Sequence, residues 1–424
     1  MARLVICGPT PLRGTIQASG AKNAALPIMA ASILARGEVI LHRVPNISDV
    51  WTMTEILRAM GARVDYNGDG RMRLDTSRVA TTAPDELVRQ MNASFDIAGP
   101  LLACYGEANV SLPGGCKLGP RPVNLHIEGF RKLGAEVTAE HGFVKARASK
   151  LKGAHILFPM VSVGATKNCM MAATLAEGET VIRNCAREPE IVDLANFLVA
   201  MGARIEGIGH STVRVHGVKK LHGTEYSIIG DRIETGTFLI GAALTAGEIT
   251  IEQCTANHLE ALLGRLAEAG QDIELRDNAI RLRARRPIKP LEIATAPYPG
   301  FPTDLHPQIV SMLALADGAS VLQENIFSGR WMYVMELVRL GADVRVSDRQ
   351  ILIRGVPRLT GAPVDAPDIR AGGALVLAAL AAEGETIISG VEYIDRGYQD
   401  IEGRLISLGA DITRVEQPLQ PIAG

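Results

Sequence analysis

The chain has 424 residues, too many for one hydrophobic core of ordinary size, so we expect two or three domains. Hydrophobic residues make up 47% and charged residues 21%, as in globular proteins, and a formal net charge of −2 argues against wholesale binding to nucleic acid or to an anionic membrane. Aromatic residues are only 4%, so the core must consist mainly of Ala, Val, Leu and Ile.

Two features bear on the compartment. The N-terminal residues MARLVICGPTPLRG lack the charged, apolar and small regions of a secretion signal, and no apolar run approaches the roughly 18 residues of a spanning helix. The six cysteines are scattered and none forms a CxxC pair. This pattern favours free thiols in a reducing cytoplasm over a disulfide framework.

A repeat of roughly 70 residues organises the chain. Each copy has an Ala/Leu-rich helix ending in Gly, a β-branched strand, a second helix ending in Gly, and another strand. The end of the second helix and the strand that follows it recur as MGARVDY at 60, LGAEVTA at 133, MGARIEG at 201, AGQDIEL at 269, LGADVRV at 340 and LGADITR at 408. Six such α/β units predict two domains of three units each, with the first glycine of each unit in the left-handed region.

The first polar group lies near the start, in SGAKNAALP. Lys22 and Asn23 stand at the mouth of an Ala-rich helix, and helix N-termini attract anions. Taken alone, the motif is better explained by a solvated lysine before a helix.

The segment SLPGGCKLGPRPVNLH, residues 111 to 126, carries the strongest chemical signal. Cys116 follows two glycines, and Lys117 and Arg121 favour its thiolate form. These features fit a nucleophile or a general acid, although a free surface cysteine is the alternative. His126 is either a base or a structural histidine at a helix start. The sequence has no zinc spacing, Walker A motif or GxGxxG, so neither a metal nor a cofactor is expected.

Late in the chain, YPGFPTDLHPQ places Asp304 in a Pro-rich loop, where it serves either as a general base or as a helix N-cap. Arg330, Arg370 and Arg396 lie at loop-to-helix joints. Each alone fits a surface ion pair, but together with Lys22 they favour an anionic substrate.

Seven segments carry a resemblance over nearly the whole chain: SGAKNAALP, LPGGCKLGPRPVNLH, VSVGAT, AREPEIVD, DRIETGTF, FPTD and IDRGY. In this order they closely resemble the UDP-N-acetylglucosamine 1-carboxyvinyltransferase family, whose more distant relative is the shikimate-pathway enolpyruvyl transferase. The resemblance implies an α/β fold of two inverse α/β barrels. Residues 1–21 and 230–424 would form one domain, and residues 22–229 the domain with the Cys116 loop.

The resemblance also implies a reaction, in which the enolpyruvyl group of phosphoenolpyruvate moves to the 3′-hydroxyl of UDP-N-acetylglucosamine with release of phosphate. Cys116 would protonate phosphoenolpyruvate, Asp304 would accept the hydroxyl proton, and Lys22, Arg121 and Arg396 would hold phosphate and carboxylate. The other implied substrate-binding residues are Asn23 and Ile326 at the sugar nucleotide, Pro122, Val123, Asn124, Leu125, Ser162, Val163 and Gly164 at the uridine, and Asn92, Arg330, Asp368 and Arg370.

The chain departs from the family at four positions. Asn92 stands where the family has arginine, Ser48 and Met160 where it has lysine, and Asn124 where it has aspartate. Lys167 is a candidate to compensate for the lost positive charge. Two alternatives follow: an enolpyruvyl transferase with another nucleotide or sugar acceptor, and a non-catalytic paralogue that binds a UDP-sugar.

Overall fold

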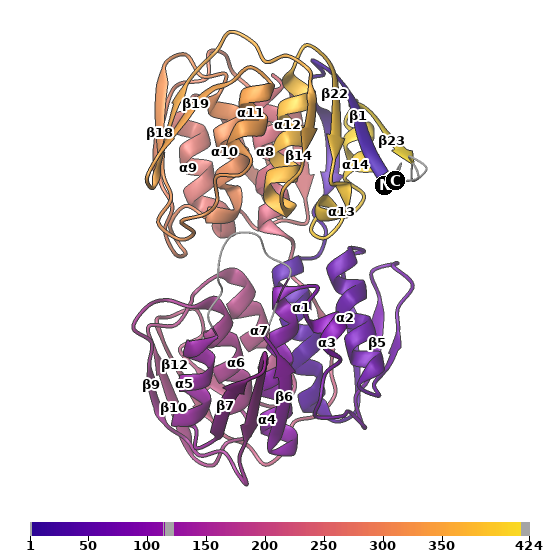
Figure 1. Cartoon of the computed structure of the whole chain (residues 1–424), viewed down its shortest axis with the longest axis vertical. Coiled ribbons are helices and arrows are strands. Elements are labelled where there is room, and N and C mark those ends of the chain that lie inside the picture. The colour runs from indigo at the N-terminus through magenta and orange to yellow at the C-terminus, as the bar shows by residue number, and fades with distance from the viewer. Residues whose placement is uncertain (1, 113, 115–122, 417–424) are drawn as a thin grey trace. The chain divides into compact units, whose positions relative to one another are not determined.

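The computed structural model of the chain describes residues 2–112, 114 and 123–416. Within these residues the chain folds into two compact units (Figure 1). Unit 1 comprises residues 2–19 and 230–416, and unit 2 comprises residues 20–112, 114 and 123–229. Cys116, Arg121 and Pro122 lie outside the described residues.

Each unit has three sheets in the described part of the chain, which confirms the predicted six repeats, three in each domain. The sheets of unit 1 are β21 (Pro363–Asp365), β22 (Gly384–Ser389), β1 (Ala2–Gly8), β23 (Asp411–Glu416); β15 (Asp272–Arg276), β16 (Ala279–Arg283), β14 (Glu248–Glu252), β2 (Arg13–Gln17); and β17 (Glu292–Ala294), β18 (Ala319–Gln323), β20 (Gln350–Arg354), β19 (Asp343–Ser347). The sheets of unit 2 are β11 (Arg204–Glu206), β12 (Thr212–His216), β10 (Glu179–Arg183), β9 (His155–Leu157); β13 (Glu225–Ser227), β3 (Glu38–His42), β5 (Met72–Asp75), β4 (Arg63–Asp65); and β6 (Glu107–Ser111), β8 (Phe143–Arg147), β7 (Glu136–Glu140).

One pairing rule recurs in the sheets. A short edge strand pairs parallel with its neighbour, and the other pairs are antiparallel, as in β13, β3, β5 and β4. The N-terminal strand β1 lies between β22 and β23, with Leu4 opposite Ile388 and Ile6 opposite Ile412. The first residues of the chain therefore complete sheets whose other strands come from the C-terminal half.

The helices form two classes. The inner helices are buried on nearly all sides: α8 (Arg232–Leu244), α10 (His306–Leu313) and α12 (Ile369–Ala381) in unit 1, and α1 (Lys22–Ala31), α4 (Ala98–Tyr105) and α6 (Val163–Ala173) in unit 2. The others, which bury one face or a single turn, are α2 (Ser48–Ala59), α3 (Asp85–Val88), α5 (Asn124–Lys132), α7 (Pro189–Ala200), α9 (Glu260–Glu268), α11 (Val334–Arg339), α13 (Val391–Ile394) and α14 (Ile401–Ser407). Four 3₁₀ turns are η1 (Ser32–Ala35), η2 (Asn92–Ile97), η3 (Ala256–Leu259) and η4 (Thr303–Leu305). The buried residues of the inner helices are mostly apolar, and the buried polar side chains among them, such as Glu234 and Lys167, find partners inside their own unit.

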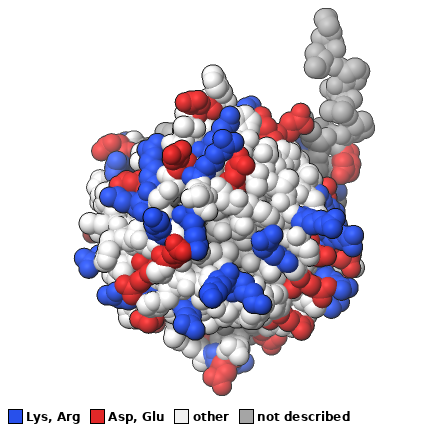
Figure 2. Space-filling view, turned by 90° about the horizontal axis from the view of Figure 1, so that it is seen from below, with Lys and Arg blue, Asp and Glu red and all other residues white. Residues whose placement is uncertain are grey.

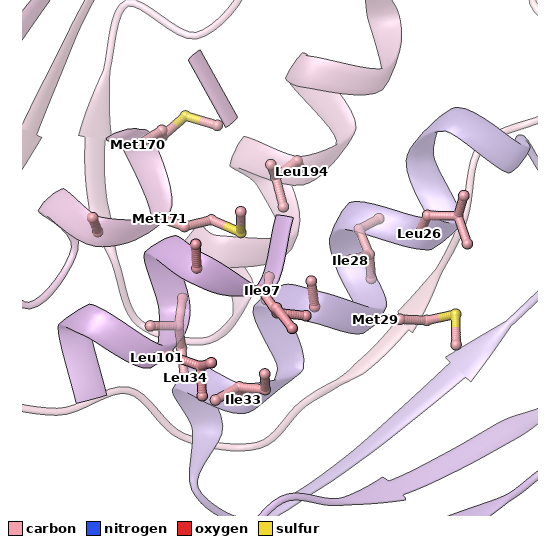
Figure 3. Close-up of a cluster of buried hydrophobic side chains, with 14 of the residues drawn as sticks. Leu26, Ile28, Met29, Ile33, Leu34, Ile97, Leu101, Met170, Met171 and Leu194 are labelled. Atoms are coloured by element: carbon pink, nitrogen blue, oxygen red, sulfur yellow. The ribbon is translucent and has the colours of Figure 1, made fainter. Parts of the chain in front are cut away.

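Figure 3 shows part of the core of unit 2, where Met29, Ile97, Leu101, Met171 and Leu194 lie among the other buried side chains. Burying a side chain of this kind contributes roughly 1.5–3 kcal/mol. The core consists mostly of Ala, Val, Leu, Ile and Met, as the low aromatic content predicted. In the face shown in Figure 2, lysines and arginines are interspersed with acidic residues.

The glycines that mark the repeat take two structural roles. Those that end the second helix of each unit, Gly61, Gly134, Gly202, Gly270, Gly341 and Gly409, all have φ between 88° and 105°. The prediction that the first glycine is always left-handed is wrong in two units, where Arg36 (φ 46°) and Ala246 (φ 55°) make the turn one residue earlier. Gly247 is needed for space instead, because a Cβ there would lie 2.1 Å from the carbonyl oxygen of Leu12.

Candidate active site

In unit 1, polar side chains gather where the inner helices begin. Asp231 caps α8 by accepting from the N–H of Ile233 (2.8 Å) and Glu234 (2.9 Å). Asp368 caps α12 by accepting from the N–H of Arg370 (2.8 Å) and Ala371 (3.0 Å). The helix starts are thus occupied by their own N-caps.

Asp304 lies between two guanidinium groups. Arg330 Nη2 donates to its Oδ1 at 2.9 Å, and Arg370 Nη2 lies 3.4 Å from its Oδ2. Neither η4 nor α10 has a side-chain cap, so the N-cap alternative for Asp304 is wrong. Asp304 retains 27% side-chain exposure, whereas the arginine side chains retain only 3% and 5%. The two buried arginines therefore hold the carboxylate of Asp304 in place, and its exposed part can still be reached from the solvent.

The two arginines have unused hydrogen-bonding capacity. Arg330 Nε and Arg370 Nη1 are buried and have no hydrogen-bond partner among the described residues. Burial alone would lower the pKa of Arg370, but Asp304, the hydroxyl of Tyr398 and Asp231 raise it above its usual value. These are buried cations and not the surface ion pairs that each motif alone suggested.

Arg396 and Ile326 also belong to unit 1. Arg396 is partly buried two residues after α13, and Ile326 follows β18 with 38% exposure.

Lys22 opens α1 in unit 2, as the sequence predicted. Its side chain is buried, and its Nζ lies 2.7 Å from Asp49 Oδ2 at the start of α2. The alternative of a solvated lysine is therefore wrong. Asn23 follows with a half-buried side chain, and Ser48 is exposed next to Asp49.

The remaining predicted residues of unit 2 lie at helix starts. Asn92 is the half-buried first residue of η2, Asn124 is the exposed first residue of α5, and Val123 and Leu125 on either side of it are buried. Ser162 caps α6 by accepting from the N–H of Ala165 at 3.3 Å. Val163 and Gly164 follow in its first turn, and Met160 just before is 65% exposed.

Behind these residues lies a buried polar network. Lys167 Nζ lies 2.5 Å from Asp96 Oδ2, so the two side chains form an ion pair within unit 2. Asn168 donates to His126 Nδ1 at 3.1 Å and accepts from the N–H of Gly99 at 2.8 Å. Burial and the Lys167 charge lower the pKa of His126 to about 3, so this histidine is neutral and has the structural role.

Four of the five described cysteines are poor nucleophiles. Burial raises the pKa of Cys104 to about 12 and that of Cys185 to about 11, and it also raises the pKa of Cys169. Cys7 is exposed, but its pKa is raised too. None of these four thiols is set up as a thiolate at neutral pH. No group of three or more His, Cys, Asp or Glu side chains in the described residues is arranged to hold a metal ion.

The sequence did not point to four residues that hold other polar side chains in place. Asp49 binds Lys22, Asp96 binds Lys167, and Thr303 binds both Glu324 and Arg330. Aligning the repeats would have flagged Glu324. The residue just after the equivalent strand is Arg43, Asn184, Gln253 or Gly390 in four other units, and only here is it acidic.

Comparison with known proteins agrees with the fold and the motifs. The family model described as EPSP synthase (3-phosphoshikimate 1-carboxyvinyltransferase) matches residues 6–405. The UDP-N-acetylglucosamine 1-carboxyvinyltransferase of Koribacter versatilis is 51% identical, covering 98% of this chain and 97% of its own, and that of Magnetococcus marinus is 50% identical, covering 98% and 100%.

Solved structures share the architecture. The enolpyruvyl transferase NikO from Streptomyces tendae superposes with a TM-score of 0.87 at 25% identity, covering 98% of this chain and 99% of its own. An EPSP synthase from Acinetobacter baumannii does so with 0.77 at 19% identity, covering 98% and 100%. These likenesses confirm the two-domain α/β fold and the resemblance read from the motifs: the chain belongs to the EPSP synthase family of enolpyruvyl transferases and, within it, groups with the UDP-N-acetylglucosamine 1-carboxyvinyltransferases.

Proposed function

We propose that the chain transfers the enolpyruvyl group of phosphoenolpyruvate to the 3′-hydroxyl of UDP-N-acetylglucosamine and releases phosphate. The observation that carries this proposal is 51% identity over 98% of the chain to an enzyme named for that transfer. The reaction is the first committed step of peptidoglycan synthesis and so serves cell-wall formation, cell shape and division.

The chemistry needs an acid, a base and fixed cations. The 3′-oxygen forms a bond to C2 of phosphoenolpyruvate while Cys116 gives a proton to C3 and Asp304 takes the hydroxyl proton. Loss of phosphate and of a C3 proton from this tetrahedral adduct then restores the double bond. The position of Asp304, ionised between Arg330 and Arg370 and still 27% exposed, supports its role as the base.

Lys22, Arg121 and Arg396 hold the phosphate and carboxylate of phosphoenolpyruvate in this proposal. Lys22 is supported by its place at the start of α1, where the helix dipole adds to its charge. Asp49 fixes the ammonium at 2.7 Å. A cation held in this way loses little entropy when it binds an anion.

On the acceptor side, Asn23 and Ile326 contact the sugar nucleotide, and residues 121–125 and 161–164 border the uridine. Asn92, Arg330, Asp368 and Arg370 complete the substrate-binding set. The exposed side chains of Ile326 and Val163 and the start of α6 support this arrangement. The partners are these two small-molecule substrates.

A second candidate is transfer to a different nucleotide or sugar. It is favoured by the neutral side chains at Ser48, Asn92 and Met160. Lys167, the candidate to compensate for these positions, pairs with Asp96 at 2.5 Å. Each missing charged contact costs about 1.5–3 kcal/mol of acceptor binding unless another group replaces it.

We place the enzyme in the cytoplasm. The described cysteines are free, which suits a reducing compartment. No helix in residues 2–112, 114 and 123–416 has both the length and the apolar character needed to cross a bilayer.

The deciding experiment measures phosphate release from phosphoenolpyruvate with UDP-N-acetylglucosamine, and in parallel with UMP and with shikimate 3-phosphate. Turnover only with the first acceptor is expected, and turnover only with another would establish the second candidate. Fosfomycin should alkylate Cys116 and leave the exposed Cys7 unmodified, which peptide mass spectrometry resolves. Full activity with an unmodified Cys116 in the drug's presence would remove Cys116 from the mechanism.

A further inference from the structure

Glu324 is a fully buried carboxylate at the end of β18. Its Oε1 accepts from Thr295 Oγ1 (2.9 Å) and from the N–H of Ile326 (2.7 Å) and Phe327 (3.0 Å). Its Oε2 accepts from Thr303 Oγ1 (2.8 Å) and His306 Nδ1 (2.9 Å). Five hydrogen bonds from three segments of unit 1 thus converge on one side chain.

His306 and Tyr333 fix this carboxylate from the other side. The Tyr333 hydroxyl lies 2.9 Å from His306 Nε2, and the two rings meet edge to face at 5.6 Å. Burial lowers the pKa of His306, so the ring is neutral. Since Nδ1 faces a carboxylate, we assign the proton to Nδ1 and let Nε2 accept from Tyr333. Burial alone would raise the pKa of Glu324, but the hydrogen bonds from His306, Phe327 and Ile326 hold it below its usual value, so Glu324 is ionised.

A chain of contacts leads from Glu324 to Asp304. The Thr303 hydroxyl, which donates to Glu324, accepts from Arg330 Nη1 at 2.9 Å. The same nitrogen also donates to the Thr303 carbonyl oxygen. The other terminal nitrogen of Arg330 donates to Asp304 at 2.9 Å. Moving or neutralising the Glu324 carboxylate therefore changes the hydroxyl that orients Arg330, and through it the place of Asp304.

The loop after β18 departs from the repeat at this residue. In four other units the residue just after the equivalent strand is left-handed, with φ of 57° at Arg43, 58° at Asn184, 56° at Gln253 and 74° at Gly390. Glu324 has no such φ, and its carboxylate instead binds the two following N–H groups. The common turn has been replaced at the unit that carries Asp304 and Ile326. A buried charge costs free energy, so packing alone does not account for the replacement.

We propose that Glu324, oriented by His306, is a positioning residue that holds the carboxylate of Asp304 and the backbone of Ile326 in one fixed arrangement. It thereby aligns the acceptor hydroxyl with its base. This inference rests on the proposed function, in which Asp304 takes the acceptor's proton and Ile326 contacts the sugar nucleotide. Glu324 itself touches neither substrate.

The first test is Glu324→Gln, which keeps the shape and removes the charge. A switch of the His306 tautomer accommodates the new amide, so the variant should fold. A sub-ångström misplacement of Asp304 should lower kcat about tenfold or more. The KM for phosphoenolpyruvate should stay within about twofold, while that for UDP-N-acetylglucosamine rises. Thr303→Val should also lower kcat, and Thr303→Ser should restore it, because only the hydroxyl joins Glu324 to Arg330.

The matched control is Ser320→Ala, on the same strand. Ser320 is equally buried and accepts from the N–H of Leu291 at 3.0 Å, near the start of β18, whereas Glu324 follows its end. This variant should lose stability and keep its kcat. A wild-type kcat in Glu324→Gln, or an equal loss of kcat in Ser320→Ala, would overturn the proposal while leaving the proposed function intact.

A second test does not depend on turnover. In Glu324→Ala the amides of Ile326 and Phe327 should exchange with deuterium about tenfold faster or more, because they lose their acceptor. The amide of Val321, bonded to the Leu291 carbonyl oxygen at 3.0 Å, should keep its rate. Unchanged exchange at Ile326 and Phe327 overturns the proposal even if wild-type protein shows no turnover with UDP-N-acetylglucosamine, a result that would refute the proposed function alone.

Discussion

Replacing Lys167 by methionine should remove one partner of a buried ion pair and leave the other. The side chains of Lys167 and Asp96 are only 11% and 5% exposed, and they meet at 2.5 Å. Burial raises the pKa of Asp96 even with Lys167 in place. Without the ammonium, the carboxylate escapes its unpaired charge by taking up a proton. At pH 7, protonating Asp96 in the folded state lowers the free energy of unfolding by at most about 4 kcal/mol, since each pH unit above the unfolded-state pKa of about 3.9 contributes about 1.4 kcal/mol.

The sign of the pH effect follows directly. The unfolded state of the variant keeps Asp96 ionised, so the folded state gains relative stability as protons become abundant. The loss in Lys167→Met should therefore shrink from about 3–4 kcal/mol at pH 7 to about 1.5 kcal/mol at pH 5.

Urea unfolding of wild type and variant at both pH values measures this difference. Two controls sharpen it. The double variant Asp96→Leu with Lys167→Met should recover most of the stability, because no unpaired charge remains. Arg147→Met breaks the exposed pair with Glu107 and should cost at most about 1 kcal/mol. A loss below about 1 kcal/mol in Lys167→Met at pH 7, or a loss independent of pH, would refute the reasoning.

Three further predictions concern named contacts. Because the pKa of His126 is lowered to about 3 in the folded state, the free energy of unfolding should fall by about 1 kcal/mol per unit as pH drops below about 6.5, and His126→Phe should remove that slope in thermal unfolding. Arg330→Lys cannot hold Thr303 and Asp304 together, so kcat for phosphate release should drop about tenfold, and the melting temperature should fall because buried hydrogen bonds are lost; equal kcat would contradict the role given to the two terminal nitrogens of Arg330. Gly129→Ala would place a Cβ 2.2 Å from Cys169 Sγ and should cost about 1–3 kcal/mol, and adding Cys169→Ala should return part of it, as chemical denaturation would show.

Several site residues could be placed from the sequence because their signal is local. Lys22 at the start of α1 and the histidine at the start of α5 were both located by the end of a loop and the start of an apolar helix. What these residues do was not decided locally. Lys22 and Asp49 are 27 positions apart in the sequence, and His126 meets Asn168 across 42. The roles given to Cys116, Arg121 and Pro122, outside the described residues, stay predictions.

Asp304 shows why two interpretations of one motif could not be separated. A carboxylate just before a helix satisfies both the pattern of an N-cap and that of a base. The choice depended on Arg330, 26 residues later, and on Arg370 at the start of another inner helix.

By itself, the sequence determined the six-unit α/β architecture, because helix periodicity, β-branched strands and the glycines that end the second helices are local properties of the backbone. It also determined the family, because the motifs recur in order along the whole chain. Only the tertiary structure decided which charges neutralise one another. Asp96 binds Lys167 and Asp49 binds Lys22, and no local pattern encodes such pairs. A buried charge is stable only beside a partner, and the partner's distance is fixed by how the inner helices and strand ends pack.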